Sequence, residues 1–326
     1  MMLIAFGTRP EYIKLKPIIE KFNDCLVLNT LQQKDLCSDI PSDFYFYNNI
    51  TLSNRLDEVT TNILNNCNGI DWSKIDSVMV QGDTATAFAI ALAAFHRKKK
   101  IFHIEAGLRT YDLDNPYPEE LYRQVITKMA DAHFCPTKQD YEVVSKESKL
   151  NSKAFITGNT VLDSISKENI IYGNDVLITL HRRENHDAIE TWLSTLNVLA
   201  QENPHLKFTW IVHPNPNVAK HRNNFNFLNC IDPVTRESMI DLMKRCRMVI
   251  TDSGGLQEEA SFLNKRTLVC RKITERPCES SILVDSPNML YEIFNNLKNE
   301  GEINYVCPFG DGKASDLIFK HVQSFV

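Results

Sequence analysis

The sequence lacks the short motifs that mark several common chemistries. No GxGxxG follows its first apolar run, no GxxxxGKS or GxxxxGKT occurs, and no GxSxG or other serine or cysteine nucleophile motif is present. The dinucleotide fingerprint, the P-loop and the hydrolase nucleophile turn are therefore excluded. Nine cysteines without one CxxC pair argue against a disulfide framework and a zinc site, and the histidines show no ligand spacing. We expect no cofactor and no metal.

Long apolar runs and an excess of positive charge are missing as well. The 326 residues are 43% hydrophobic and 24% charged, with a formal net charge of −5, which gives no indication of nucleic-acid binding. No run approaches the roughly 18–20 apolar residues of a membrane span, and the N-terminal apolar stretch meets Arg9 too early for a signal peptide. Free thiols fit a reducing compartment. We therefore expect a soluble cytoplasmic protein that binds neither membranes nor nucleic acid, and we interpret the basic run 96–100 as a solvated turn.

What the sequence does contain is a regular alternation of short apolar runs with amphipathic segments. Runs at 2–6, 176–180 and 248–251 alternate with helix-like segments such as 83–95. Such alternation predicts parallel sheets that are covered on both faces. Because about six strands fall in each half, we predict an α/β fold with two Rossmann-like, doubly wound domains that face a central cleft. Polarity rises around residues 163–173, which places the domain boundary there.

Charged side chains directly follow the predicted strands of the first half. Asp83 and Glu105 each stand at the end of an apolar run, Glu119 opens a helix behind a proline-braced loop, and Arg9 begins the first helix. Each alone would also fit an ordinary cap or surface charge. Because the carboxyl ends of parallel strands share one edge, we expect the three acids to converge, and crowded carboxylates suit proton transfer. An arginine at a helix start suits a phosphate or carboxylate.

The second half presents anion-binding features at its strand ends. His181 and two arginines follow one strand, and His213 follows the next within a rigid proline-containing loop. The later stretch TDSGGLQEEA puts two glycines in the first turn of a helix, with Asp252 or Ser253 as its cap. Bare backbone N–H groups at a helix start favour an anion. With a second anion clamp expected in 271–277, the pattern predicts a phosphorylated, nucleotide-linked substrate.

Ten segments in a fixed order over nearly the whole chain resemble the motifs of the non-hydrolysing UDP-N-acetylglucosamine 2-epimerases. They are GTRPEYIK (7–14), QGDT (81–84), HIEAGLRT (103–110), PYPEE (116–120), TGNTVLD (157–163), HRREN (181–185), HPNPN (213–217), DSGGLQEE (252–259), TERP (274–277) and GDG (310–312). The resemblance implies a GT-B fold, with domains at 1–166 and 167–308 and a last helix, in 309–326, that crosses back to the first domain. It also implies a homodimer and the interconversion of UDP-N-acetylglucosamine and UDP-N-acetylmannosamine without a cofactor.

The resemblance further implies roles for individual residues. The family eliminates UDP across C1–C2 of the sugar to give a bound glycal, then adds UDP back with C2 protonated from the other face. Asp83, Glu105 and Glu119 match its catalytic carboxylates, with the order of base and acid left open, and His181 matches its active-site histidine. The positions expected to bind the substrate or its UDP are Arg9, Lys14, Arg109, Arg182, His213, Ser253, Gly254, Gly255, Glu259 and Arg276.

Within that set, the turn at 253–255 matches the pyrophosphate cradle, and Glu259 matches the carboxylate that holds the ribose hydroxyls. One segment departs from the family pattern. Many members of the family carry a QHR-type sequence that binds a second UDP-GlcNAc as an activator, whereas this chain has Gln32-Gln33-Lys34 at that place. Lysine is a poor replacement for a bidentate arginine. The alternatives are another UDP-2-acetamido sugar as substrate, a hydrolysing relative that releases free sugar and UDP, a GT-B glycosyltransferase, and a non-catalytic UDP-sugar sensor.

Overall fold

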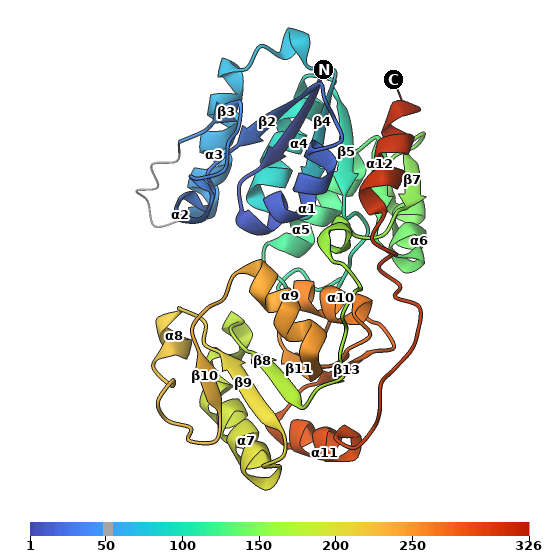
Figure 1. Ribbon diagram of the computed structural model, residues 1–326. Coiled ribbons are helices and arrows are strands. Elements are labelled where there is room, and N and C mark those ends of the chain that lie inside the picture. Colours follow the sequence, from blue (N-terminus) through green and yellow to red (C-terminus); the bar gives the residue numbers. More distant parts are fainter. Residues whose placement is uncertain (48–54, 326) are drawn as a thin grey trace. The chain divides into compact units, whose positions relative to one another are not determined.

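The computed structural model describes residues 1–47 and 55–325, and the chain divides into two compact units (Figure 1). Unit 1 comprises Met1–Ser164 and Pro308–Val326, and unit 2 comprises Ile165–Cys307. The chain therefore passes from one unit to the other twice, and its C-terminal segment returns to the unit in which it began.

Unit 1 is built on a seven-stranded parallel sheet with the order β3-β2-β1-β4-β5-β6-β7. Its strands are β1 (Met2–Phe6), β2 (Cys25–Asn29), β3 (Phe44–Tyr45), β4 (Ser77–Gln81), β5 (Lys100–Ile104), β6 (Ala132–Cys135) and β7 (Lys153–Ile156). Every residue of β1 and β4 is buried, because helices cover both faces of a doubly wound sheet. This burial explains why continuous apolar runs mark the central strands in the sequence.

The helices of unit 1 connect these strands and pack on both faces of the sheet. They are α1 (Arg9–Ile19), α2 (Lys34–Cys37), α3 (Arg55–Asn66), α4 (Ala85–His96), α5 (Glu119–Met129), α6 (Lys138–Glu147) and α12 (Ala314–Gln323), with 3-10 turns η1 (Cys67–Gly69), η2 (Trp72–Lys74) and η3 (Thr160–Ser164). The alanine-rich α4 is largely buried between its neighbours α3 and α5. One apolar cluster contains α4, and a second cluster contains α1 and α12.

Unit 2 repeats the same plan with a six-stranded parallel sheet of order β10-β9-β8-β11-β12-β13. Its strands are β8 (Asp175–Thr179), β9 (Lys207–Ile211), β10 (Asn229–Ile231), β11 (Cys246–Thr251), β12 (Arg266–Cys270) and β13 (Ser281–Val284). Its helices are α7 (Ile189–Glu202), α8 (Pro216–Ala219), α9 (Arg236–Arg245), α10 (Gly254–Phe262) and α11 (Pro287–Leu297), with a 3-10 segment η4 (Arg183–Ala188). One large apolar cluster joins α7 and α11 to the sheet.

Helix α12, red in Figure 1, is anchored to unit 1 at its start and along its apolar face. The carboxylate of Asp163 accepts the backbone N–H groups of Ala314 at 3.0 Å and Ser315 at 2.6 Å, which satisfies two donors at the start of the helix. Ile318 and Val322 are buried in the unit 1 core. The C-terminal helix is therefore part of the first folding unit although it follows the whole of the second.

Both sheets reverse their strand order beside their first strand. In unit 1, β1 lies between β2 and β4, and in unit 2, β8 lies between β9 and β11. Ligands of doubly wound sheets bind beyond the carboxyl ends of the strands at this switch point. The segments that begin at Gly7 and Gly82 in unit 1, and at Leu180 and Asp252 in unit 2, occupy these positions. The prediction of two Rossmann-like α/β domains is confirmed.

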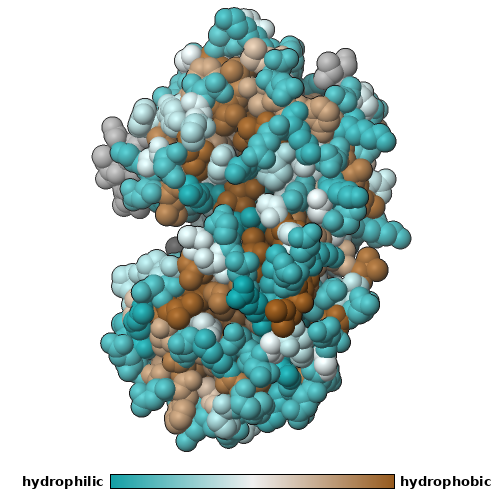
Figure 2. Space-filling model, viewed as in Figure 1, coloured by the Kyte–Doolittle hydropathy of each residue, from teal (hydrophilic) through white to brown (hydrophobic). Residues whose placement is uncertain are grey.

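Polar residues dominate the face of the molecule that Figure 2 presents, with apolar residues in smaller patches. Large apolar side chains are also exposed, as at Tyr117 and Leu150, a common feature of protein surfaces. Among the described residues, none of the helices has the length and apolar character that a bilayer crossing requires.

Candidate active site

Asp83, directly after β4, is held by a buried arginine of α5. The Nη2 of Arg123 lies 2.7 Å from Oδ2 of Asp83, and its Nη1 lies 3.5 Å from Oε2 of the fully buried Glu120. Glu120 also accepts the backbone N–H groups of Thr110 and Tyr111, at 3.0 and 3.2 Å. A buried carboxylate thus fixes the guanidinium that in turn orients Asp83 at the switch point of the sheet.

Glu105, directly after β5, is buried and surrounded by hydrogen-bond donors. The Nζ of Lys14 lies 2.6 and 2.8 Å from its two carboxylate oxygens, the Nδ2 of Asn159 donates to Oε1 at 2.9 Å, and the side-chain amide of Gln81 donates to Oε2. The backbone of Glu105 has φ +62°, the left-handed region that non-glycine residues rarely adopt. Strain of this kind is concentrated at functional sites, where the surroundings hold it in place.

The structure brings Asp83 and Glu105, two of the three predicted catalytic acids, to neighbouring strand ends of unit 1. A Cβ added to Gly82 would lie 3.5 Å from Oε2 of Glu105, so that carboxylate lies against the residue before Asp83. Glu119 is the first residue of α5, one helical turn before the Arg123 that binds Asp83. The contacts of Arg123 and Gln81 therefore join the ends of β4 and β5 to the start of α5.

Arg9 and Lys14 both lie on α1, but they have different partners. Lys14 bonds to Glu105, as described above, whereas the guanidinium of Arg9 lies on the exposed surface and donates to both carboxylate oxygens of Asp39 at 3.0 and 3.1 Å. A capping box closes the start of α1, where Thr8 and Glu11 exchange hydrogen bonds.

Arg109 has a structural environment. Its guanidinium is 2% exposed and donates to Glu147 at 2.8 and 3.0 Å, to Thr127 at 2.9 Å and to the carbonyl of Leu108 at 2.7 Å. These bonds anchor the loop before α5 to α6. These contacts favour a role for Arg109 in holding this loop in place.

In unit 2, the fully buried Asp252 organises the loop after β8. Its Oδ2 accepts the backbone N–H groups of His181 and Arg182, both at 2.9 Å, and the side-chain amide of Asn185 at 3.0 Å. Its Oδ1 lies 3.3 Å from the Nδ1 of His181. Asp252 therefore fixes both the backbone and the imidazole of His181, a role that differs from the helix cap expected from the sequence.

His181 and His213 form a stacked pair at the ends of neighbouring strands. Their ring centroids are 4.9 Å apart with an interplanar angle of 13°. Burial lowers the pKa of His181 below its ordinary value, although the nearby Asp252 opposes this shift. Burial, followed by the proximity of His181, also lowers the pKa of His213. Both imidazoles are therefore neutral at neutral pH.

Helix α10 begins at the switch point of unit 2 without a side-chain cap. Ser253 occupies the N-cap position, but its side chain accepts no capping hydrogen bond from the first turn. Gly254 packs closely, because a Cβ there would lie 2.7 Å from Nη1 of Arg276, whereas a Cβ on Gly255 would meet nothing within 4 Å. The start of α10 thus combines bare backbone donors with open space, the arrangement that suits an anion.

Glu259 and Arg276 are both engaged in ion pairs near this turn. Glu259 is buried on α10 and accepts from Nη2 of Arg236 at 3.0 Å. Arg276 donates from Nε to the fully buried Glu258 at 2.7 Å and also pairs with Glu275. Arg276 therefore packs against Gly254, and Glu258 and Glu275 hold its guanidinium in that position.

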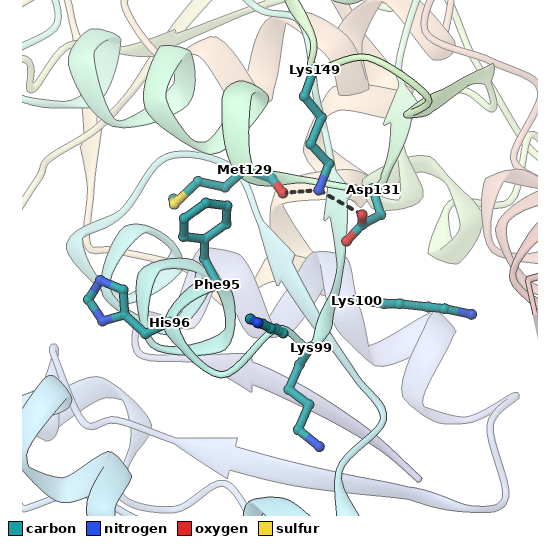
Figure 3. A pocket seen from close by; sticks show the side chains of 8 residues that line it. Phe95, His96, Lys99, Lys100, Met129, Asp131 and Lys149 are labelled. Atoms are coloured by element: carbon teal, nitrogen blue, oxygen red, sulfur yellow. Dashed lines mark hydrogen bonds and ion pairs between the residues drawn. The ribbon is translucent and has the colours of Figure 1, made fainter.

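Two of the surface hollows in the described part of unit 1 lie at segments that the sequence analysis singled out. One, of about 420 Å³, is lined by residues of the basic run and by Lys149, whose Nζ binds Asp131 at 2.6 Å and the carbonyl of Met129 at 2.8 Å (Figure 3). It lies at the amino-terminal end of β5, the opposite end of the strand from Glu105. The other, also about 420 Å³, is lined by residues 31–36 and Arg55, the segment that departs from the family pattern.

No group of three or more His, Cys, Asp and Glu residues within 1–47 and 55–325 is arranged to hold a metal ion. The residues that could hold an organic ligand are those at the two switch points. Sequence reasoning missed Arg123, Asn159 and Gln81 as members of this site. Arg123 follows Glu119 at helical i, i+4 spacing, and Asn159 and Gln81 stand inside the quoted TGNTVLD and QGDT segments, which are the signals that could have identified them.

Two parallel-sheet units with polar side chains gathered at their switch points define a protein of the GT-B fold. A family model described as UDP-N-acetylglucosamine 2-epimerase matches residues 38–323. The chain belongs to this family. It is 37% identical to the UDP-N-acetylglucosamine 2-epimerase of Campylobacter jejuni, over 97% of this chain and 96% of that relative.

Solved structures support the same relationship. The crystal structure of UDP-GlcNAc 2-epimerase from Neisseria meningitidis bound to UDP-GlcNAc matches with a TM-score of 0.87 at 33% identity, covering 99% of both chains. The Methanocaldococcus jannaschii UDP-GlcNAc 2-epimerase in complex with UDP-GlcNAc and UDP matches with a TM-score of 0.81 at 28% identity, covering 99% of this chain and 100% of that one.

Proposed function

We propose that this protein interconverts UDP-N-acetylglucosamine and UDP-N-acetylmannosamine by inverting C2 of the sugar. A base removes the C2 proton as the C1–O bond breaks and UDP departs, which leaves a C1–C2 double bond in a bound glycal. A proton is then delivered to C2 from the opposite face, and a UDP oxygen re-forms the bond to C1. No atom is gained or lost, and the acid–base groups required are those that carboxylates supply.

The observation that carries the proposal is the placement of Asp83 and Glu105, in two different settings, at neighbouring strand ends of unit 1. Glu105 is surrounded by amide and ammonium donors, whereas Asp83 pairs with Arg123. Two carboxylates that are held by different partners can serve separately as the base that removes the C2 proton and the acid that returns it. Asp83, Glu105 and Glu119 are the proposed catalytic acids, with Lys14 as a partner of Glu105.

Unit 2 supports a role in holding the UDP. The start of α10, with Ser253, Gly254 and Gly255, supplies backbone donors for the pyrophosphate. The remaining unit 2 positions that we propose to contact UDP are His181, Arg182, His213 and Glu259. Arg276 would support the turn through its contact with Gly254. Arg9 would have to break its ion pair with Asp39 before it could bind a phosphate.

Turnover in deuterated water tests this function. Incubation with UDP-GlcNAc should give UDP-ManNAc that carries deuterium at C2, detected by NMR. Asp83→Asn, Glu105→Gln and Glu119→Gln should each lower kcat by at least about 100-fold, the lower end of what a positioned acid–base group contributes. Their affinity for UDP, measured by calorimetry, should stay close to that of the wild type.

The exposed Glu142 of α6 provides a matched control, and Glu142→Gln should turn over at the wild-type rate. Absence of both the epimer and C2 exchange would refute the proposal. Free UDP that accumulates in step with free sugar would instead indicate the hydrolysing reaction. A panel of UDP-2-acetamido sugars, including a 6-deoxy sugar, tests the substrate.

We also infer a cytoplasmic homodimer by similarity to the family. The nine cysteines are all free thiols, which fits a reducing compartment. Light scattering of the purified protein measures the subunit number directly, and a monomer at micromolar concentration would contradict the dimer.

A further inference from the structure

Asn159 links the candidate catalytic Glu105 to a distant part of the chain. It lies after β7 and is 2% exposed. Its Nδ2 donates to Oε1 of Glu105 at 2.9 Å, and its Oδ1 accepts the backbone N–H of Val161 at 3.2 Å. Since the amide oxygen is committed to the start of η3, the amide nitrogen is directed at the carboxylate.

The backbone of Asn159 is fixed by the segment that returns from unit 2. Its N–H donates to the carbonyl of Phe309 at 2.7 Å, one residue after the boundary at Pro308. The preceding Gly158 has φ +80°, and a Cβ there would lie 2.8 Å from the Phe309 oxygen, so only glycine allows this approach. The position of the Asn159 side chain is therefore set by backbone contacts on both sides.

Glu105 needs such support because its own backbone is strained and its carboxylate has several competing partners. The left-handed φ of +62° does not hold the side chain in place by itself. The ammonium of Lys14 sits on a long flexible stem and can follow the carboxylate. The short side chain of Asn159, anchored at its other end, can instead fix one oxygen in place.

We propose that Asn159 is a positioning residue that holds the carboxylate of Glu105 in its reactive orientation and fastens it to the return segment at Phe309. The proposal rests on the catalytic role of Glu105 in the function proposed above. In this proposal Asn159 acts through Glu105 and not on the sugar itself.

Asn159→Asp tests this role with almost no change in shape. The substitution keeps the oxygen that accepts from Val161 and the backbone bond to Phe309, and it replaces the donor facing Glu105 by an oxygen. We expect kcat to fall by at least about 100-fold with KM within about threefold, because proton transfer depends on the orientation of the carboxylate. Two carboxylates in contact compete for one proton, so the acid limb of the pH–rate profile should also move to higher pH.

Asp163→Asn is the matched control, because it weakens the cap on α12 without contacting Glu105. We expect this variant to keep a wild-type kcat and pH–rate profile. If Asp163→Asn lost as much activity as Asn159→Asp, the effect would belong to the anchoring of the return segment and the proposal would be overturned. A wild-type kcat and pH profile in Asn159→Asp would overturn it equally.

A double-mutant cycle followed by thermal unfolding tests the contact without any turnover. Asn159→Asp should lower Tm at pH 8 by about 5 °C, because two buried carboxylates then face each other. Adding Glu105→Gln should recover most of that loss, since the new amide can donate to the new carboxylate. If the wild type fails to epimerise UDP-GlcNAc, the proposed function is refuted, but this cycle still tests the contact between Asn159 and Glu105. Additive changes in Tm would overturn the positioning role.

Discussion

Glu11 makes the stability of the protein depend on pH in a predictable direction. Its carboxylate is fully buried at the start of α1 and accepts the N–H groups of Gly7 at 3.0 Å and Thr8 at 2.8 Å and the hydroxyl of Thr84 at 2.6 Å. Burial raises the pKa of Glu11 from 4.5 to about 7, although the hydrogen bonds lower it. The folded protein therefore binds this proton more tightly than the unfolded chain does.

The sign and size of the effect follow from this difference. The stabilisation due to the protonated carboxyl is fully present below pH 4.5 and is lost as the pH rises through about 7. The gap between the two pKa values corresponds to about 3 kcal/mol of unfolding free energy. Glu11→Gln removes the titration while keeping an oxygen for the two N–H groups and a nitrogen that can donate to Thr84.

Unfolding of the wild type and Glu11→Gln by guanidinium chloride between pH 4.5 and pH 8 measures the contribution of Glu11 to the unfolding free energy. The difference in unfolding free energy should move in favour of the variant by up to about 3 kcal/mol across the range. The exposed substitution Glu142→Gln should give a curve parallel to that of the wild type. Parallel curves for Glu11→Gln as well would refute the reasoning, because they would mean that Glu11 binds its proton equally in the folded and unfolded states.

Two further substitutions probe the contacts that hold Asp83 in unit 1 and the loop at His181 in unit 2. Arg123→Met removes the cation that faces both Asp83 and the buried Glu120. Urea unfolding should therefore show an unfolding free energy that is lower by about 3–5 kcal/mol, and a loss under about 1 kcal/mol would contradict a structural role for this ion pair. Asp252→Asn replaces one carboxylate oxygen, which accepts from the loop at His181, by an amide donor. Calorimetry should then show UDP affinity reduced about tenfold. Unchanged affinity would mean that this loop does not contact UDP.

The sequence predicts the strands well because burial on both faces makes them continuous apolar runs. The predicted run 2–6 coincides with β1 at both ends, whereas the runs 176–180 and 248–251 differ from β8 and β11 by one or two residues at an end. The two-residue β3 was missed, because so short a strand at the edge of a sheet carries no periodic signal. Strand order could be anticipated only as a doubly wound pattern, since pairing depends on contacts that no single segment records.

The candidate site is predictable where chemistry is attached to strand ends and less so where partners come from elsewhere. Asp83 and Glu105 are visible from the sequence because each follows an apolar run directly. The buried state of Arg109 is not visible, because an arginine in a loop reads the same whether it faces solvent or anchors Glu147. The TGNTVLD segment draws attention to Asn159, but the sequence does not show that its partner is Glu105, 54 positions away in the chain.

The neutral state of the stacked histidines bears on how unit 2 could hold the UDP that leaves and returns in the proposed reaction. An uncharged imidazole at His181 adds hydrogen bonding but no charge, so in the proposed function the start of α10 and Arg182 would supply the attraction for the pyrophosphate. A bound pyrophosphate would itself raise the pKa of His181, because nearby negative charge favours the protonated ring. The ring would thus gain proton affinity only while UDP is present. A donor that becomes charged in this way stabilises the departing phosphate without trapping free anions in the resting protein, which suits a reaction in which UDP leaves C1 and then bonds to it again.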